Sequence, residues 1–176
     1  KLDKRKKRHT NNVRDIAFKA AHSVVDKAKV IVCEDLTSPI PDKKKYGKHQ
    51  SRRLSGWVKG TMADAIETVS QRRGASLSLV NAAYTSQMDS RYGILLGQRN
   101  GDTFYCFDGV VQDADTNAAR NILARQGDKE ISLYTPYKQV KAILLHRTAE
   151  VKQRLGLLNL DTSCNGYQLA LSLSTV

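Results

Sequence analysis

The sequence has few of the residues that mark several large protein classes. It contains only three cysteines, Cys33, Cys106 and Cys164, which are odd in number and far apart. This pattern excludes a disulfide framework and a metal site built from cysteines alone, so we expect a reducing compartment. Only three prolines and eleven glycines occur in 176 residues, of which 40% are hydrophobic, and this favours a folded chain over a disordered one.

Long apolar runs are also absent. No stretch approaches the length of a membrane-spanning helix, and no signal-peptide pattern opens the chain. We therefore expect no membrane association and a cytoplasmic, bacterial, nucleic-acid-associated protein. Acidic residues are in the minority, because 29 Lys and Arg face 17 Asp and Glu and leave a net charge of +12. A balance this basic favours a polyanionic partner, for which nucleic acid is the first candidate.

Hydrophobic periodicity divides the chain into helices and strands. Apolar residues at helical spacing predict helices over about 12–29, 51–73 and 136–155. The continuous apolar run 30–33 is typical of a strand buried on both faces of a sheet, and the alternation over 76–80 predicts another strand. The sequence thus mixes helices and strands along its length.

Basic residues gather in three places. The run Lys4–Arg8 predicts a solvated arm that can contact phosphates, and Lys43, Lys44 and Lys45 lie in a loop predicted over 37–50. Arg52 and Arg53 stand at the start of a predicted helix, where the helix dipole disfavours cations. A bound phosphate would explain that placement, and a solvated pair is the alternative. We predict that these clusters bind nucleic acid.

Three short motifs carry the chemistry of the sequence. Glu34-Asp35-Leu36 follows the first predicted strand, Tyr84-Thr85-Ser86-Gln87 follows the second, and Asp113 and Asp115 begin a predicted helix. That helix has an apolar face formed by Ala118, Ala119, Ile122 and Leu123. Each carboxylate alone has an ordinary explanation, because Asp is a favoured helix cap and a strand end is often solvated.

In this order, E-D-L, Y-T-S-Q and D-T-N-A-A resemble the C-terminal half of the RuvC-like nuclease domain of RNA-guided DNA nucleases. The relatives are transposon-encoded TnpB proteins and type V CRISPR effectors, and the resemblance covers roughly residues 10–125. It implies an α/β RNase H-like fold, here a partial mixed sheet flanked by helices with an inserted hairpin. The implied organisation is a nuclease portion over 1–126, with the insertion at 84–109, and a helical C-terminal extension over 127–176.

The same resemblance implies a set of catalytic residues. Glu34 matches the glutamate of E-D-L and Asp115 matches the aspartate of D-x-N-A-A, with Asp113 as an auxiliary ligand. Asn117 would orient Asp115 or the nucleic acid. Carboxylates suit hard cations such as Mg²⁺ or Mn²⁺, and two such ions about 3.5–4 Å apart activate water and stabilise the leaving oxygen of a phosphodiester.

A third carboxylate of the family, on the first strand of its fold, has no match in the sequence. Asp3 has no strand before it and no glycine beside it. The chain starts without Met inside a basic run, so we expect the missing strands in a preceding part of the same nuclease. We also expect this piece alone to be inactive.

The family's zinc ribbon corresponds to residues 84–109. Asp89 and Tyr92 stand where the first two cysteines would be, and the second knuckle retains only Cys106, one residue out of step if Asp108 replaces the last cysteine. Structural zinc requires four thiolate or imidazole ligands. We therefore predict no zinc and a metal-free hairpin held by aromatic side chains, namely Tyr92, Phe104, Tyr105 and Phe107.

Together, the residues and the resemblance predict the nuclease portion of an RNA-guided DNA endonuclease. Its partners would be a guide RNA and target DNA, with guide pairing reading the target sequence. The lost cysteines and the tail after the last motif favour a CRISPR effector over a TnpB protein. Two alternatives stay open: a catalytically silent nucleic-acid-binding relative, and another RNase H-like enzyme such as a DDE transposase or a Holliday-junction resolvase.

Overall fold

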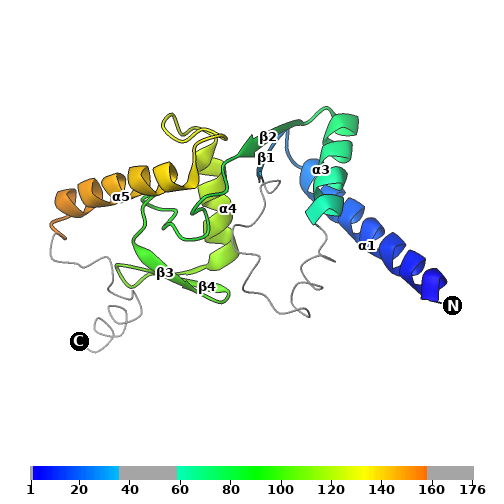
Figure 1. The fold of residues 1–176 in the computed structure, drawn as a ribbon, viewed down its shortest axis with the longest axis horizontal. Helices are drawn as coiled ribbons and strands as arrows, with labels where there is room; N and C mark the ends of the chain where they lie inside the picture. The colour runs from blue at the N-terminus through cyan, green and yellow to red at the C-terminus, as the bar shows by residue number, and fades with distance from the viewer. Residues whose placement is uncertain (1, 36–58, 158–176) are drawn as a thin grey trace. The chain divides into compact units, whose positions relative to one another are not determined.

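The computed structural model describes residues 2–35 and 59–157. Helices and strands follow one another in the order α1, β1, α3, β2, β3, β4, β5, α4, α5 (Figure 1), so the architecture is α/β, as predicted. Contacts divide the chain into two compact units, Lys1–Ser78 and Leu79–Val176. The sequence-based boundaries 1–126 and 127–176 stay a prediction. Within the described ranges, every helix is too short or too polar to cross a membrane.

In the first unit, two helices pack on one another beside a pair of strands. α1 (Leu2–Val25) and α3 (Lys59–Arg73) lie side by side (Figure 1), while β1 (Val30–Glu34) pairs with β2 (Ser76–Val80). The buried residues between these elements are small or branched: Ala17, Ala21, Val25, Ile31, Ala65 and Val69. Alanines one turn apart on α1 allow the two helix backbones to approach closely.

α1 is longer than the sequence predicted. The helix begins at Leu2, so the run Lys4–Arg8, expected to be a solvated arm, forms part of its first turns. Lys and Arg are good helix formers, and Lys4, Arg5, Lys7 and Arg8 are exposed to solvent on this helix. The prediction was wrong because a run of like charge was taken as a sign of missing structure.

β1 occupies its predicted place, with Glu34 as its last residue. The prediction that this strand is buried on both faces was wrong, since Val30 is 49% exposed whereas Ile31 is 7% exposed. Among the described strands β1 has β2 as its neighbour, and two strands leave part of each face open. β2 itself confirms the strand predicted over 76–80.

α3 ends where the sequence predicted. Gly74 follows Arg73 with φ of +67°, a left-handed conformation that stops a helix at little cost for glycine. The earlier part of the predicted 51–73 helix lies outside the described residues. So do the predicted loop 37–50 and the nucleic-acid-binding candidates it was expected to present, namely Lys43, Lys44, Lys45, Arg52 and Arg53.

The second unit contains an antiparallel sheet and two helices. β3 (Gly97–Asn100), β4 (Thr103–Cys106) and β5 (Val111–Asp113) pair in that order, and β3 with β4 forms a hairpin inside the segment 84–109. α4 (Ala114–Arg125) follows directly. α5 (Tyr137–Arg154) confirms the helix predicted over 136–155 and begins after Pro136.

α5 covers the loop that precedes the hairpin. Its Val140 and Leu144 pack with Tyr84, Met88 and Ile131 in one buried cluster. A second cluster joins the hairpin to the last turns of α5 and consists of Ile94, Leu96, Phe107 and Val151. The segment after residue 126 therefore packs directly on the inserted segment that comes before α4.

Gly97 allows the hairpin to close on Phe104. With φ of +143°, a Cβ at this position would lie 2.8 Å from the Phe104 ring and 2.8 Å from the Tyr105 carbonyl oxygen. We expect Gly97→Ala to lower the free energy of unfolding by about 2–4 kcal/mol, since overpacking adds to backbone strain. Urea unfolding followed by circular dichroism measures this loss.

Gly101→Ala is the matched control in the same hairpin. Gly101 has φ of +59°, but a Cβ there meets nothing within 4 Å. Its loss should be about 1 kcal/mol, from backbone strain alone. Equal losses in the two variants would show that the contact with Phe104 is unimportant.

Candidate functional site

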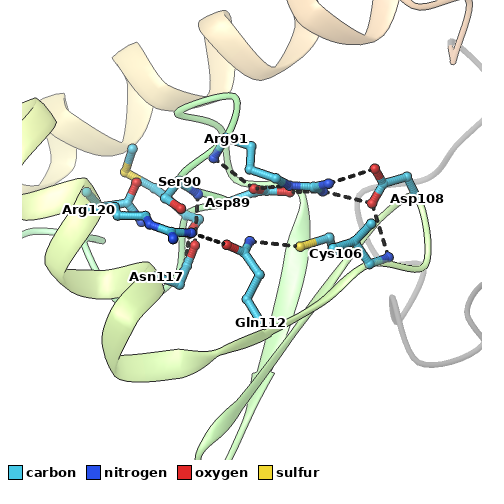
Figure 2. Close-up of polar contacts among 11 residues, drawn as sticks. Asp89, Ser90, Arg91, Cys106, Asp108, Gln112, Asn117 and Arg120 are labelled. Carbon is cyan, nitrogen blue, oxygen red and sulfur yellow. Dashed lines mark hydrogen bonds and ion pairs between the residues drawn. The ribbon is translucent and has the colours of Figure 1, made fainter.

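In the second unit, Arg91 lies between the carboxylates of Asp89 and Asp108, within the segment 84–109 (Figure 2). Its guanidinium donates to Asp89 Oδ2 at 2.8 Å and to both carboxylate oxygens of Asp108, at 2.7 and 2.9 Å. The Asp89 side chain is fully buried and that of Asp108 is 33% exposed. Hydrogen bonds from Arg91 hold the pKa of Asp108 below its usual value, so this ion pair is intact at neutral pH.

The same residues close a tight turn. Asp89 accepts from the Arg91 amide at 3.0 Å through its side chain and from the Gly93 amide at 2.8 Å through its carbonyl. The Asp89 amide donates to the Ile94 carbonyl at 2.9 Å. We call residues 83–94 the Arg91 loop. Asp89 and Asp108, which stand at or beside positions where the resemblance implies cysteines, thus bind a guanidinium.

The aromatic residues predicted to hold the hairpin contribute unequally. Phe104 is 0% exposed and Phe107 is 9% exposed, and the Tyr92 ring lies 5.4 Å from the Phe107 ring. Tyr92 itself is 39% exposed. The part of the chain that the structure describes holds no group of three or more His, Cys, Asp or Glu side chains suited to a metal ion. The absence of zinc stays a prediction.

Cys106 belongs to a hydrogen-bonded chain that joins β4, β5 and α4 (Figure 2). Gln112 donates to its sulfur at 3.1 Å and accepts from Arg120 at 3.1 Å. Burial raises the pKa of the Cys106 thiol to about 11. The thiol is therefore neutral at physiological pH, and a neutral thiol is a poor nucleophile.

α4 presents a buried polar face to the Arg91 loop. Asn117, 0% exposed, donates to the Met88 carbonyl at 2.7 Å and accepts from the Ser90 amide at 2.9 Å. Asn121 donates to the carbonyls of Thr85 and Met88 at 2.9 and 2.8 Å. These bonds satisfy backbone groups that a loop cannot pair internally.

One turn further along α4, Arg125 is 4% exposed and donates to the Ala83 carbonyl at 3.3 Å. Leu123, one of the residues of the predicted apolar face, is 62% exposed. The buried side of α4 is mostly polar, because α4 packs on a loop with many backbone polar groups. The spacing of four between Asn117, Asn121 and Arg125 is the sequence signal that would have revealed this polar face.

The two carboxylates at the start of α4 have different surroundings. Asp113 is the N-cap and accepts from the Thr116 amide at 2.7 Å, and this hydrogen bond lowers its pKa. The Asp115 side chain is 81% exposed and accepts from Arg99 of β3 at 2.9 Å. The cap is therefore Asp113, and capping does not explain Asp115.

The structure places the remaining predicted site residues as follows. Glu34 ends β1 in the first unit, whereas Asp113, Asp115 and Asn117 start α4 in the second, and the two units are described separately. Asn117 contacts the Arg91 loop, and its role toward Asp115 or nucleic acid stays a prediction. Sequence reasoning missed three anchoring residues of this site, namely Arg91, Asn121 and Arg125.

Residues 60–122 match the family model described as Cas12f1-like, TNB domain. The match links the chain to Cas12f- and TnpB-type effectors, and it contains the Arg91 loop, the hairpin and Asp115. No curated protein matches the chain.

Removing the Arg91 guanidinium should destabilise the second unit strongly. Arg91→Met leaves the fully buried Asp89 without its cation, and an uncompensated buried charge costs about 3–5 kcal/mol. Urea unfolding at pH 7 measures the loss. Arg99→Met is the matched control, because the Arg99–Asp115 pair is 34% and 81% exposed and should contribute less than about 1 kcal/mol. Similar losses in both variants would contradict a special role for Arg91.

Two lowered carboxylate pKa values predict acid sensitivity. Hydrogen bonds from Arg91 lower the pKa of Asp108. Burial acts to raise the pKa of Asp128, but hydrogen bonds from Arg147 outweigh burial, so the pKa of Asp128 is lowered as well. Because the unfolded chain binds these protons more readily, stability is present above the ordinary value of 3.8 and is lost as the pH falls below it. Urea unfolding from pH 7 to pH 2 tests this. Arg91→Met should have a shallower pH dependence, and an unchanged one would exclude the Asp108 contribution.

Proposed function

We propose that this chain is the C-terminal nuclease portion of an RNA-guided DNA endonuclease, with Glu34 and Asp115 as carboxylate ligands of Mg²⁺. The observation that carries the proposal is Asp115, which is exposed, is not the helix cap, and lies in the matched segment. The RNase H-like arrangement of the sheet belongs to the same proposal. So do the remaining strands and the third carboxylate, which a preceding part of the nuclease would supply.

The donor chemistry fits a hard cation. Carboxylate oxygens at the end of β1 and in the first turn of α4 are the ligands that Mg²⁺ or Mn²⁺ prefers. When bound, such ions activate water and stabilise the leaving oxygen of a phosphodiester. This chain would supply Glu34 and, in the first turn of α4, Asp115. Asp113 caps the helix that carries it, and Asn117 fixes that helix to the Arg91 loop.

Positive charge supports a nucleic-acid partner, which we propose to be a guide RNA paired with target DNA. Lys4, Arg5, Lys7 and Arg8 are exposed on α1, so a rigid helix presents them together. With Lys43–Lys45 and the Arg52-Arg53 pair, they would neutralise several backbone phosphates. Binding through such contacts weakens steeply with salt.

A catalytically silent nucleic-acid-binding relative is the second candidate function. The observation that favours it is the pairing of Asp115 with Arg99, because a guanidinium on a carboxylate competes with a metal ion. In that case the basic residues would act in binding and the carboxylates would have no chemical role.

Asp115→Asn in the complete nuclease separates the two candidates. If Asp115 holds a metal ion, loss of its charge should lower Mg²⁺-dependent DNA cleavage by roughly 10³-fold or more, as for groups that act as one unit. Guide and target binding should stay nearly unchanged. Cleavage of a labelled target strand and a parallel binding assay measure the two effects.

Asp113→Asn, two positions away, is the control. Asn caps a helix about as well as Asp, so this variant should keep both the fold and most of the cleavage. Near-normal cleavage by Asp115→Asn would overturn the catalytic assignment. A wild-type protein that binds guide and target but never cleaves would establish the silent relative.

A further inference from the structure

The segment between α4 and α5 is fixed from both sides by hydrogen bonds. Arg147 of α5 donates to both oxygens of Asp128 at 2.7 and 2.8 Å and also pairs with Glu130. Asn81 donates to the carbonyls of Ser132, Leu133 and Thr135 at 3.3, 3.3 and 2.9 Å. The segment is thus an ordered connection whose backbone has little freedom.

A tight turn at its end displays a tyrosine. The Thr135 amide donates to the Ser132 carbonyl at 3.1 Å, and the Ser132 amide donates to the Thr135 hydroxyl at 2.9 Å. These bonds close the turn around Leu133 and Tyr134. Tyr134 is 88% exposed. A fixed backbone thus presents a large aromatic ring to water.

A second exposed tyrosine follows three residues later. Tyr137, the first residue of α5, is 56% exposed, and its ring stacks on that of Tyr84, with centroids 4.6 Å apart and an angle of 25° between the planes. Burial raises the pKa of Tyr84 to about 12, and a hydrogen bond with Tyr137 adds to the effect. Tyr84 is therefore neutral at physiological pH, and its contact holds the Tyr137 ring in place.

Two lysines follow the two tyrosines. Lys138 is next to Tyr137, and Lys141 lies one turn further along the same face of α5 as Tyr137, both exposed. Within the described part of the chain, neither lysine takes part in an ion pair. The carboxylates of Asp128 and Glu130, earlier in the same segment, both pair with Arg147, which cancels one of their two charges. The charge available to a partner beside these rings is therefore positive.

We propose that Tyr134 and Tyr137 form a tyrosine platform on which unpaired bases of single-stranded nucleic acid stack, while Lys138 and Lys141 contact the backbone phosphates. Aromatic faces beside cations are the usual elements of single-strand binding, and they need no particular base sequence. A duplex fits this surface less well, because its bases are already stacked on one another. The inference rests on the proposed function only in taking nucleic acid as the partner, and it adds a site built from residues other than Glu34 and Asp115.

Tyr134→Ala is the principal test, with a fluorescent oligothymidine strand as the probe and the whole 176-residue chain as the protein. Loss of one base–aromatic stack should weaken binding roughly tenfold at every salt concentration. The slope of log affinity against log salt should stay unchanged, because no phosphate contact is removed. Tyr134→Phe keeps the ring and should bind like the wild type. Lys138→Ala with Lys141→Ala should reduce the slope.

Three controls make the test specific. A strand of abasic sites with the same number of phosphates should bind wild type and Tyr134→Ala equally, since it offers no bases. Leu155→Ala, at the far end of α5, removes an apolar side chain that is 42% exposed and should leave binding unchanged. Tyr137→Phe keeps the ring and its stack on Tyr84, so, like Tyr134→Phe, it should bind like the wild type.

Several outcomes would overturn the platform. Equal affinity of Tyr134→Ala and wild type for oligothymidine would overturn it while leaving the proposed function intact. An equal loss on the abasic strand would show that the tyrosine does not act through bases. A wild-type dimer that Tyr134→Ala converts to a monomer would make this face a self-association surface. A wild-type chain that binds no nucleic acid would remove the proposed function as well.

Discussion

The ion pairs of Arg91 are the interaction on which the second unit depends. Asp89 is fully buried, and a buried carboxylate is tolerated only when a cation and hydrogen bonds compensate its charge. Arg91 supplies the cation and Asp108 fixes the guanidinium from the other side. The resulting turn aims the Met88 carbonyl and the Ser90 amide at α4. The Arg91 guanidinium, a planar group with five hydrogen-bond donors, thus joins the segments of Asp89 and Asp108. The family resemblance implies that a zinc ion would join these two segments.

This arrangement explains why α4 is polar where it is buried. A helix that packs on a sheet meets side chains, because the sheet pairs its own backbone groups. A helix that packs on a loop meets carbonyl and amide groups that need partners. Asn117 and Asn121 provide those partners, and their shared contact with the Met88 carbonyl fixes the loop to the helix. Because this polar face is the buried one, Leu123 on another face of α4 is exposed.

The sequence predicted the helix ends that depend on a single residue. Gly74 after α3 and Pro136 before α5 are examples, because left-handed backbone and a fixed φ act within one turn. Features set by distant partners were not predictable in this way. The pairing of Arg91 with Asp108 joins residues 17 apart in the sequence, and no periodicity connects them. The start of α1 was missed for a different reason, since like charge outweighed helix propensity in the interpretation of Lys4–Arg8.

The start of α4 shows how the sequence located the candidate site but could not divide its roles. Asp113 and Asp115 are two positions apart, and residues at that spacing on a helix point in different directions. Asp113 therefore accepts a hydrogen bond from the Thr116 amide, while Asp115 projects toward solvent and Arg99. From the sequence alone either residue could have been the cap, which left the ordinary explanation open for both. Once the cap is assigned to Asp113, the charge of Asp115 has no part in starting the helix. The exposed Asp115 carboxylate then already binds one cation, the Arg99 guanidinium. A divalent ion competes more strongly for the same carboxylate oxygen when further carboxylates coordinate that ion as well.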